Sequence, residues 1–179
     1  MAYAEALNEE VSELKAAGAD VIQIDEPYMQ ANLREADAFG VAAIDRALDG
    51  IEGPTVAHLC FGYAYVVADK PEGYAFLPQL DACAAEAIFI EAAQPNLDPV
   101  ILEKLPNKKI LYSVINLGIQ EVETAELVAN RLRGALAHIS ADRLIAAPDC
   151  GMKYLPRDVA FGKLNALVEG TAMVRDELN

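Results

Sequence analysis

The amino-acid sequence predicts a parallel α/β protein built from repeated strand–helix units. Helical and extended patterns alternate along all 179 residues, without an evident linker, internal repeat or low-complexity tract. The extended segments are short and almost continuously apolar, which is typical of strands covered on both faces. Because 54% of the residues are apolar, the chain can bury a substantial core. We therefore expect one domain spanning residues 1–179.

The first third of the chain is expected to form a helix, a strand and a second helix. Residues 4–17 place apolar side chains at helical spacing opposite acidic ones, and Gly18 is a suitable helix stop. The run 21–25 (Val-Ile-Gln-Ile-Asp) predicts a strand, which Pro27 ends because proline cannot donate a backbone hydrogen bond. The helical pattern resumes over 35–48.

The middle of the chain repeats this alternation with shorter elements. A strand is expected over 55–59, immediately before Cys60. A helix over 77–85 then leads into a strand over 87–91, and a short helix is expected over 99–104.

The last third predicts a strand over 109–115, a strongly periodic helix over 124–138, a strand over 143–147 and a closing helix over 158–176. Five strands joined by helices imply a parallel sheet with right-handed crossovers. A closed barrel of such units needs eight strands and typically about 250 residues. The pattern therefore leaves two architectures open: an open doubly wound sheet, or a barrel that lacks its first three βα units.

Composition excludes several classes of function. The net charge of −14 argues against nucleic-acid binding, which depends on lysine and arginine, and against an anionic membrane surface. No apolar run is long enough to span a bilayer, and the N-terminus lacks the pattern of a secretion signal, so we expect a soluble, cytoplasmic protein. Three cysteines do not suggest a disulfide framework and are better suited to be thiols or metal ligands.

Metal-binding side chains lie at or just beyond the ends of three predicted strands. They are His58, Cys60, Glu91 and Cys150. The carboxyl ends of parallel strands share one edge of the sheet, so these residues are expected to converge there. Each residue alone would more often belong to an ordinary core, but two thiols, an imidazole and a carboxylate together form a ligand set suited to zinc. The sequence therefore predicts a zinc site.

Two further residues of these types are expected to be structural. Cys83 lies in an alanine-rich stretch of the helix predicted over 77–85, where a cysteine usually packs as a small apolar residue. His138 ends the helix predicted over 124–138, where a polar or cationic tip suits the exposed carbonyl groups.

Four motifs of the chain resemble, in the same order, the zinc-bearing barrel of cobalamin-independent methionine synthases. The motifs are Ile22-Gln-Ile-Asp-Glu-Pro27, His58-Leu-Cys60, Ile90-Glu91 and Pro148-Asp-Cys-Gly-Met-Lys153. The likeness runs through the whole chain and implies a (β/α)8 barrel of the TIM type that lacks its first three βα units. It also implies a zinc-dependent methyltransferase, in which His58, Cys60, Glu91 and Cys150 hold the metal. The thiol of homocysteine would be activated there for methyl transfer, giving methionine.

The resemblance also implies a substrate site and a methyl donor. It makes Asp25 the carboxylate that receives the amino group of homocysteine. Folate-dependent members carry an Asp-Ile-His segment whose His protonates the leaving tetrahydrofolate, whereas this chain has Asn116 for the Asp and Gly118 for the His. We therefore expect Asn116 to lie at the substrate site, and methylcobalamin or a corrinoid protein, rather than methyltetrahydrofolate, to supply the methyl group.

Two alternative functions remain open, and the chain is also expected to assemble with a partner. A related zinc-thiolate alkyltransferase would use coenzyme M in place of homocysteine. A non-catalytic zinc-binding half-barrel would bind the metal without methylating any thiol until a partner is added. An open sheet edge tends to pair with another chain, so we expect a homodimer or assembly with a complementing N-terminal segment.

Overall fold

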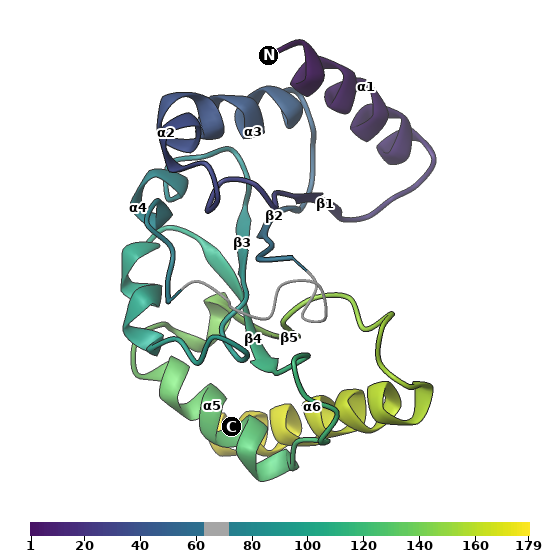
Figure 1. The fold of residues 1–179 in the computed structure, drawn as a ribbon, viewed down its shortest axis with the longest axis vertical. Coiled ribbons are helices and arrows are strands. Elements are labelled where there is room, and N and C mark those ends of the chain that lie inside the picture. The colour runs from purple at the N-terminus through teal and green to yellow at the C-terminus, as the bar shows by residue number, and fades with distance from the viewer. Residues whose placement is uncertain (63–71) are drawn as a thin grey trace.

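The computed structural model of the chain describes residues 1–62 and 72–179 (Figure 1). The strands in these segments form a single parallel sheet in the order β1-β2-β3-β4-β5. The strand bounds are β1 Ile22–Asp25, β2 Thr55–Leu59, β3 Ala87–Ile90, β4 Lys109–Ile115 and β5 Leu144–Pro148. The predicted strands and their parallel arrangement are confirmed.

The helical segments follow the predicted alternation with the strands. Their bounds are α1 Ala2–Ala16, α2 Leu33–Glu35, the π-helical η1 Ala36–Gly40, α3 Val41–Ala47, α4 Leu77–Leu80, the 3₁₀ turn η2 Pro99–Lys104, α5 Ala125–Leu136, the 3₁₀ turn η3 Ala141–Arg143 and α6 Arg157–Leu178. The helix predicted over 35–48 is therefore a continuous helical stretch that starts at Leu33 and contains a π-helical segment.

The helix predicted over 77–85 was wrong in its length, because α4 ends at Leu80. Groups from elsewhere in the chain bind the backbone that follows. Asp45 accepts a hydrogen bond from the amide of Ala84 at 2.6 Å, and Lys108 Nζ donates to the carbonyls of Cys83 and Ala85 at 2.5 and 2.7 Å. Over residues 83–85, tertiary hydrogen bonds thus take the place of helical ones. Cys83 itself is buried in the core, as expected, although it lies beyond the helix.

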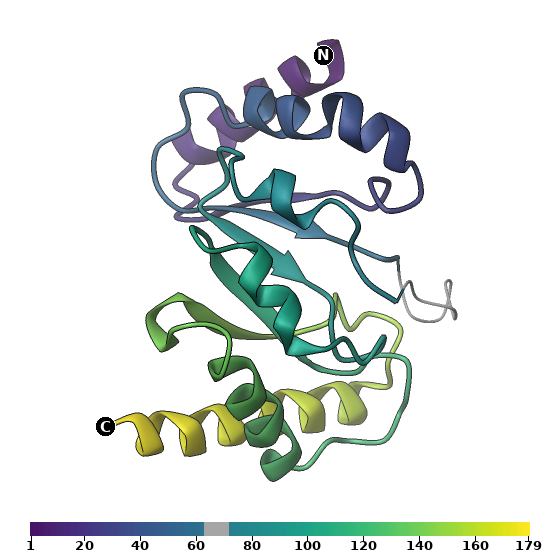
Figure 2. The ribbon, with the colours of Figure 1, turned by 90° about the vertical axis from the view of Figure 1, so that its left-hand side faces the viewer.

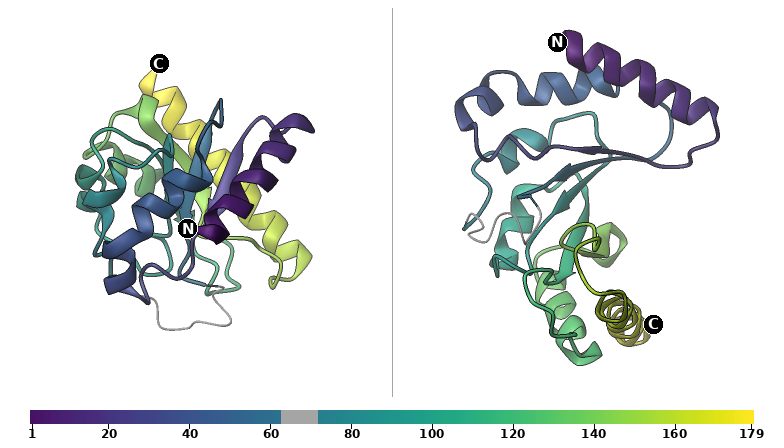
Figure 3. Two further views of the ribbon diagram at one scale, coloured as in Figure 1. Left: turned by 90° about the horizontal axis from the view of Figure 1, so that it is seen from above. Right: turned by 45° about the vertical axis from the view of Figure 1, so that its right-hand side comes forward.

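The sheet is curved, and the helices lie along its outer side (Figures 2 and 3). The main core lies between the helices and alternate strand residues such as Ala57, Ile88 and Ile110. The opposite sheet face carries a small cluster made only of strand residues among those described, namely Val56, Ala87, Phe89, Leu111 and Ala147. A doubly wound sheet would carry helices on both faces. The described part of the chain carries them on one.

Strand register brings the carboxyl ends of the strands together at one edge of the curved sheet. Asp25 pairs with His58 between β1 and β2, and Leu59 pairs with Ile90 between β2 and β3. The pairing of β4 with β5 shifts between Ser113 and Ile115, close to the end of the ladder. The residues that follow β1, β2, β3 and β5 are therefore neighbours.

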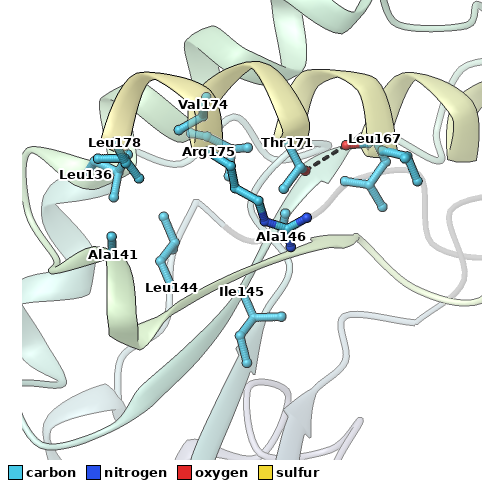
Figure 4. A pocket seen from close by; sticks show the side chains of 12 residues that line it. Leu136, Ala141, Leu144, Ile145, Ala146, Leu167, Thr171, Val174, Arg175 and Leu178 are labelled. Atoms are coloured by element: carbon cyan, nitrogen blue, oxygen red, sulfur yellow. Dashed lines mark hydrogen bonds between the residues drawn. The ribbon is translucent and has the colours of Figure 1, made fainter.

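The first and last strands form the two edges of the sheet within the described residues. A groove of about 880 Å³ beside β1 is lined by apolar residues of α1, β1 and η1, including Leu7, Ile24 and Phe39. A smaller pocket of about 340 Å³ lies between β5 and α6, where Arg175 extends over Ala146 (Figure 4). Large apolar side chains remain exposed at both edges: Tyr3, Leu14, Val21 and Phe39 on one side, and Ile145, Phe161, Leu164 and Val168 on the other.

No helix in residues 1–62 or 72–179 is long and apolar enough to cross a membrane.

Candidate metal centre

Four predicted ligand residues meet at the carboxyl edge of the sheet. His58 is the second-last residue of β2, Cys60 and Glu91 directly follow β2 and β3, and Cys150 lies two residues beyond the end of β5. One ligand atom from each residue lies within 4.8 Å of the others. Residues separated by as many as 92 positions therefore converge, as the strand-end argument expected; their binding of zinc stays a prediction.

The two ring nitrogens of His58 have different surroundings. Nδ1 lies 2.9 Å from Oδ1 of Asp25, and because a carboxylate can only accept, this nitrogen carries the proton. Nε2 is buried, lies 3.6 Å from Glu91 Oε1 and has no hydrogen-bond partner among the described residues. The ring stacks on Phe89 with centroids 4.1 Å apart, which fixes its plane. A buried nitrogen close to a carboxylate and two thiols suits a metal ligand.

The carboxylate of Glu91 is almost fully buried, with 1% of the residue exposed. Its Oε1 accepts a hydrogen bond from the backbone amide of Phe61 at 3.1 Å. The hydroxyl of Tyr74 donates to the carbonyl of Leu59 at 3.0 Å and accepts from the amide of Glu91 at 2.9 Å. Tyr74 thus connects the ends of β2 and β3, which carry three of the four ligand residues.

The two cysteines form a pair whose sulfur atoms lie 3.8 Å apart. The hydrogen bond from Cys60 lowers the pKa of Cys150 to about 7, while the same bond and burial raise the pKa of Cys60. The backbone amide of Gly62 also donates to Cys60 Sγ at 3.2 Å. Gly62 has a φ of 81°, a left-handed conformation that glycine adopts without strain, and this turn directs its amide back toward the sulfur.

Burial disfavours a charge on His58, but interactions with Glu91 and with Asp25 outweigh it and raise the pKa of His58. The site thus concentrates negative groups around one imidazole. A cation placed between them would balance this charge.

Geometry and donor chemistry both fit zinc. Two sulfur ligands at about 2.3 Å from a tetrahedral zinc lie about 3.8 Å apart, and the sulfurs of Cys60 and Cys150 have this separation. The buried Nε2 of His58, which lacks a hydrogen-bond partner within the described segments, would gain one in the metal. The proton on Nδ1, held by Asp25, leaves the Nε2 lone pair free to coordinate.

The predicted substrate residues occupy different positions relative to this cluster. Asp25 contacts His58 directly and has 64% of its side chain exposed, so it remains accessible to a ligand. Asn116 lies just after β4, outside the four-residue cluster, where its Oδ1 accepts from the amide of Gly118 at 2.7 Å. Both substrate roles stay predictions.

Three residues beside the site were not predicted from the sequence. Tyr74 has no motif around it that points to the site. Ser113 is a buried polar residue within an apolar strand, and Asp149 is a buried carboxylate between Pro148 and Cys150. Ser113 and Asp149 could have been found from the sequence, because each is a polar residue within or directly after an apolar run, and such a residue needs a hydrogen-bond partner when it is buried.

Comparison with known proteins gives a consistent family. The family described as cobalamin-independent synthase, catalytic domain, matches residues 1–173. The methionine synthase of Sulfurisphaera tokodaii is 35% identical over 176 residues, which cover 98% of this chain and 49% of that protein. A methionine synthase of Saccharolobus islandicus is 36% identical over 178 residues, covering 98% of this chain and 50% of the relative.

Solved structures agree with the sequence relatives. A B12-independent methionine synthase from Shewanella sp. W3-18-1, solved with selenomethionine, has 37% sequence identity and a TM-score of 0.92, and the match covers 98% of this chain and 54% of that chain. A methyltransferase from Methanosarcina mazei shares the fold, with a TM-score of 0.64 at 20% identity. The chain spans about half the length of the curated relatives that it matches.

Proposed function

Because the chain belongs to the cobalamin-independent methionine synthase family, we propose that it forms the zinc-binding part of an enzyme that methylates the thiol of homocysteine. The observation that carries the proposal is the meeting of His58, Cys60, Glu91 and Cys150 around a buried Nε2 without a hydrogen-bond partner in the described residues. These four residues would hold zinc.

When bound there, zinc would lower the pKa of a coordinating substrate thiol so that its sulfur reacts as a thiolate. Asp25 holds the proton of His58 on Nδ1 and therefore keeps Nε2 available as a ligand. The exposed side of the same carboxylate would receive the ammonium group of homocysteine, because a hydrogen bond between opposite charges would orient the substrate. Glu91 is almost fully buried, so its carboxylate is shielded from bulk water.

The segment after β4 supports a corrinoid donor. Gly118 stands where folate-dependent members carry a general acid, and a Cβ at this position would lie 2.9 Å from Gln94 Cδ and 3.1 Å from Asn116 Oδ1. A histidine would require both side chains to move. A donor whose leaving group needs no proton, such as methylcobalamin, is therefore our proposal, with Asn116 at the substrate site.

We also propose that the sheet is part of a (β/α)8 barrel and that residues 1–179 are one incomplete zinc-binding barrel domain. Helices on the outer side and a strand-only cluster on the other side support this architecture. The partner would be a second copy or a complementing N-terminal segment that covers the free edges of β1 and β5.

The test is zinc content followed by thiol methylation. Untagged protein purified without added metal is expected to contain close to one zinc per chain by elemental mass spectrometry. Cys150→Ser should lose most of this zinc, because an alcohol is a far weaker zinc ligand than a thiolate. Cys83→Ser is the matched control, since Cys83 is buried outside the cluster. Full zinc content and methyl transfer in Cys150→Ser would overturn the proposal.

Methyl transfer is measured as methionine formed from homocysteine with methylcobalamin or methyltetrahydrofolate. Faster turnover with methylcobalamin is expected, and an equal or faster rate with the folate would contradict the donor proposal. Coenzyme M in place of homocysteine distinguishes the related alkyltransferase.

A second candidate is a non-catalytic zinc-binding half-barrel, which the two apolar edges favour. It predicts bound zinc with no methylation of either thiol until a complementing segment is added.

A further inference from the structure

Asp149 is a carboxylate with 1% exposure that lies between the end of β5 and the ligand residue Cys150. Its Oδ1 accepts hydrogen bonds from the amides of Ala92 and Ala93 at 3.1 and 2.9 Å, and its Oδ2 accepts from the amide of Gln94 at 2.7 Å. The hydroxyl of Ser113 donates to the same Oδ1. One carboxylate therefore binds three consecutive amides of the segment that follows Glu91.

These contacts join two parts of the sheet that do not pair with each other. In the strand order, β4 lies between β3 and β5, so no ladder hydrogen bonds connect the residue after β3 with the residues after β5. Ser113 belongs to β4, and its Oγ also accepts from the amide of Ala92 at 2.6 Å. Asp149 therefore connects the end of β5 to the segment after β3, and its hydrogen bond with Ser113 connects it to β4 as well.

The energetic cost of burying this carboxylate indicates that its contacts hold firmly. A buried carboxylate without hydrogen bonds is strongly unfavourable, and loss of one donor leaves an unsatisfied charge. Four donors in fixed positions offset that cost and restrict both the carboxylate and the backbone that it binds. The segment 92–94 cannot shift without breaking them.

Two ligand residues adjoin this connection directly. Glu91 immediately precedes Ala92, and Cys150 immediately follows Asp149. The other two, His58 in β2 and Cys60 just after it, lie on the segment that Tyr74 connects to the end of β3. The side chain of Asp149 thus links Cys150, which follows it in the chain, to the segment after β3 that carries Glu91. It does so through direct hydrogen bonds to the amides of residues 92–94.

We propose that Asp149, with Ser113, is a positioning residue for the metal site, which sets the placement of Cys150 relative to Glu91. The inference rests on the proposed zinc centre and adds to it a residue outside the ligand set. A residue that only stabilises the fold would change the free energy of unfolding but leave the metal affinity and ligand field of the folded protein unchanged.

The experiment measures zinc affinity by competition with a chromogenic chelator in the full chain and in Asp149→Asn. Asparagine keeps the shape, but its amide nitrogen cannot accept, so at least one hydrogen bond from the amides of 92–94 to this side chain is lost. Affinity is expected to fall on the order of 10- to 100-fold, the usual effect of removing a residue that orients metal ligands. Asp142→Asn is the matched control: it is the same substitution at an exposed residue of η3, and affinity should stay within about twofold.

Cobalt(II) substitution supplies a readout that a purely structural role would not alter. The thiolate-to-cobalt absorbance per bound cobalt is expected to fall in Asp149→Asn, because Cys150 would no longer be held in place. Ser113→Ala removes one donor and should weaken zinc binding by about 10-fold, the low end of the same range. If Asp149→Asn does not fold, the zinc affinity and the cobalt(II) spectrum of Ser113→Ala test the positioning role instead.

The outcomes separate this inference from the proposed function. A parent chain that binds no zinc would overturn both. A parent chain that binds zinc, with affinity and cobalt spectrum unchanged in Asp149→Asn (or, if it is unfolded, in Ser113→Ala), would overturn the positioning role alone.

Discussion

His58 shows how single atoms define this site. Its Nδ1 has the carboxylate of Asp25 as a partner, whereas its buried Nε2 has no hydrogen-bond partner among the described residues. An unsatisfied buried nitrogen costs stability, so its presence needs a compensating role. Metal coordination would supply one. Under the proposed function Asp25 would have two separable tasks, orientation of the histidine, which its hydrogen bond to Nδ1 supports, and capture of a substrate ammonium group.

Substitution of Asp25 should separate these tasks. Asp25→Asn keeps an oxygen that can accept from Nδ1 but loses the charge, so zinc affinity should be retained while KM for homocysteine rises on the order of 10-fold or more. Asp25→Ala should also weaken zinc binding, by about 10- to 100-fold. Steady-state kinetics and chelator competition measure the two effects, and exposed Asp20→Asn is the control. An unchanged KM in Asp25→Asn would remove the substrate role.

Buried tyrosines give the chain a distinct alkaline titration. Burial raises the pKa of Tyr112 to about 12. In the unfolded chain a tyrosine loses its proton near pH 10, so between about pH 10 and 12 the unfolded state releases a proton that the folded state keeps. The free energy of unfolding should therefore fall through this window, by up to about 1.4 kcal/mol per pH unit from this residue.

Tyr112→Phe checks this prediction. The variant should show a shallower loss of stability between pH 10 and 12 in urea denaturation. Tyr74, whose pKa burial also raises, continues to contribute to the slope. Identical slopes in the parent and the variant would contradict the assignment.

At the scale of elements, α6 stabilises the loop that follows β4. Lys163 of α6 is fully buried, and its Nζ donates to Glu123 Oε2 at 2.8 Å and to the carbonyls of Asn116 and Glu121 at 3.0 and 2.6 Å. The other oxygen of Glu123 accepts from the amide of Asn116 at 2.8 Å. The ion pair thus shapes the segment that carries Asn116 and Gly118, and it explains why a lysine lies on the inner side of a helix.

Removal of one partner of this pair should be costly. Lys163→Met is expected to lower the free energy of unfolding by about 3 kcal/mol, because it leaves buried Glu123 with only the more distant Arg131, 3.7 Å from its Oε1, as a cationic partner. The double substitution with Glu123→Gln should cost less than the sum of the single ones. Urea denaturation measures all three, with exposed Lys104→Met as a control within about 0.5 kcal/mol. Additive single effects would show that the pair is not coupled.

The whole molecule is a curved parallel sheet with helices on its outer side and two edges without a neighbouring strand in the described residues (Figure 3). Each edge carries an apolar groove and exposed large side chains, such as Phe39 beside β1 and Val168 on α6. Apolar surface of this kind usually marks an interface. The proposed partner would cover these edges.

Self-association of the chain should depend on these edges. Sedimentation velocity is expected to show concentration-dependent association, which Phe39→Glu or Val168→Glu reduces by placing a charge in the contact. Val100→Glu, at a partly exposed position of η2 away from both edges, is the control. A parent chain that stays monomeric at every concentration would contradict association through a second copy.

The sequence by itself determined the order of strands and helices, the parallel sheet and the four candidate ligands. Apolar runs and helical periodicity are local signals, and the carboxyl ends of parallel strands share one edge whatever the surrounding packing. The local signals failed beyond Leu80, where the helix ends and where Asp45 and Lys108 bind the backbone of residues 83–85.

The tertiary structure alone decided the side of the sheet on which the helices lie, the proton position on His58, and the connections made by Tyr74, Ser113 and Asp149. Each of these depends on atoms from segments that are distant in the chain, and a hydrogen bond of this kind leaves no periodic pattern in the sequence. These hydrogen bonds form because a polar group that is buried away from water needs a partner, and the fold supplies that partner from another segment of the chain.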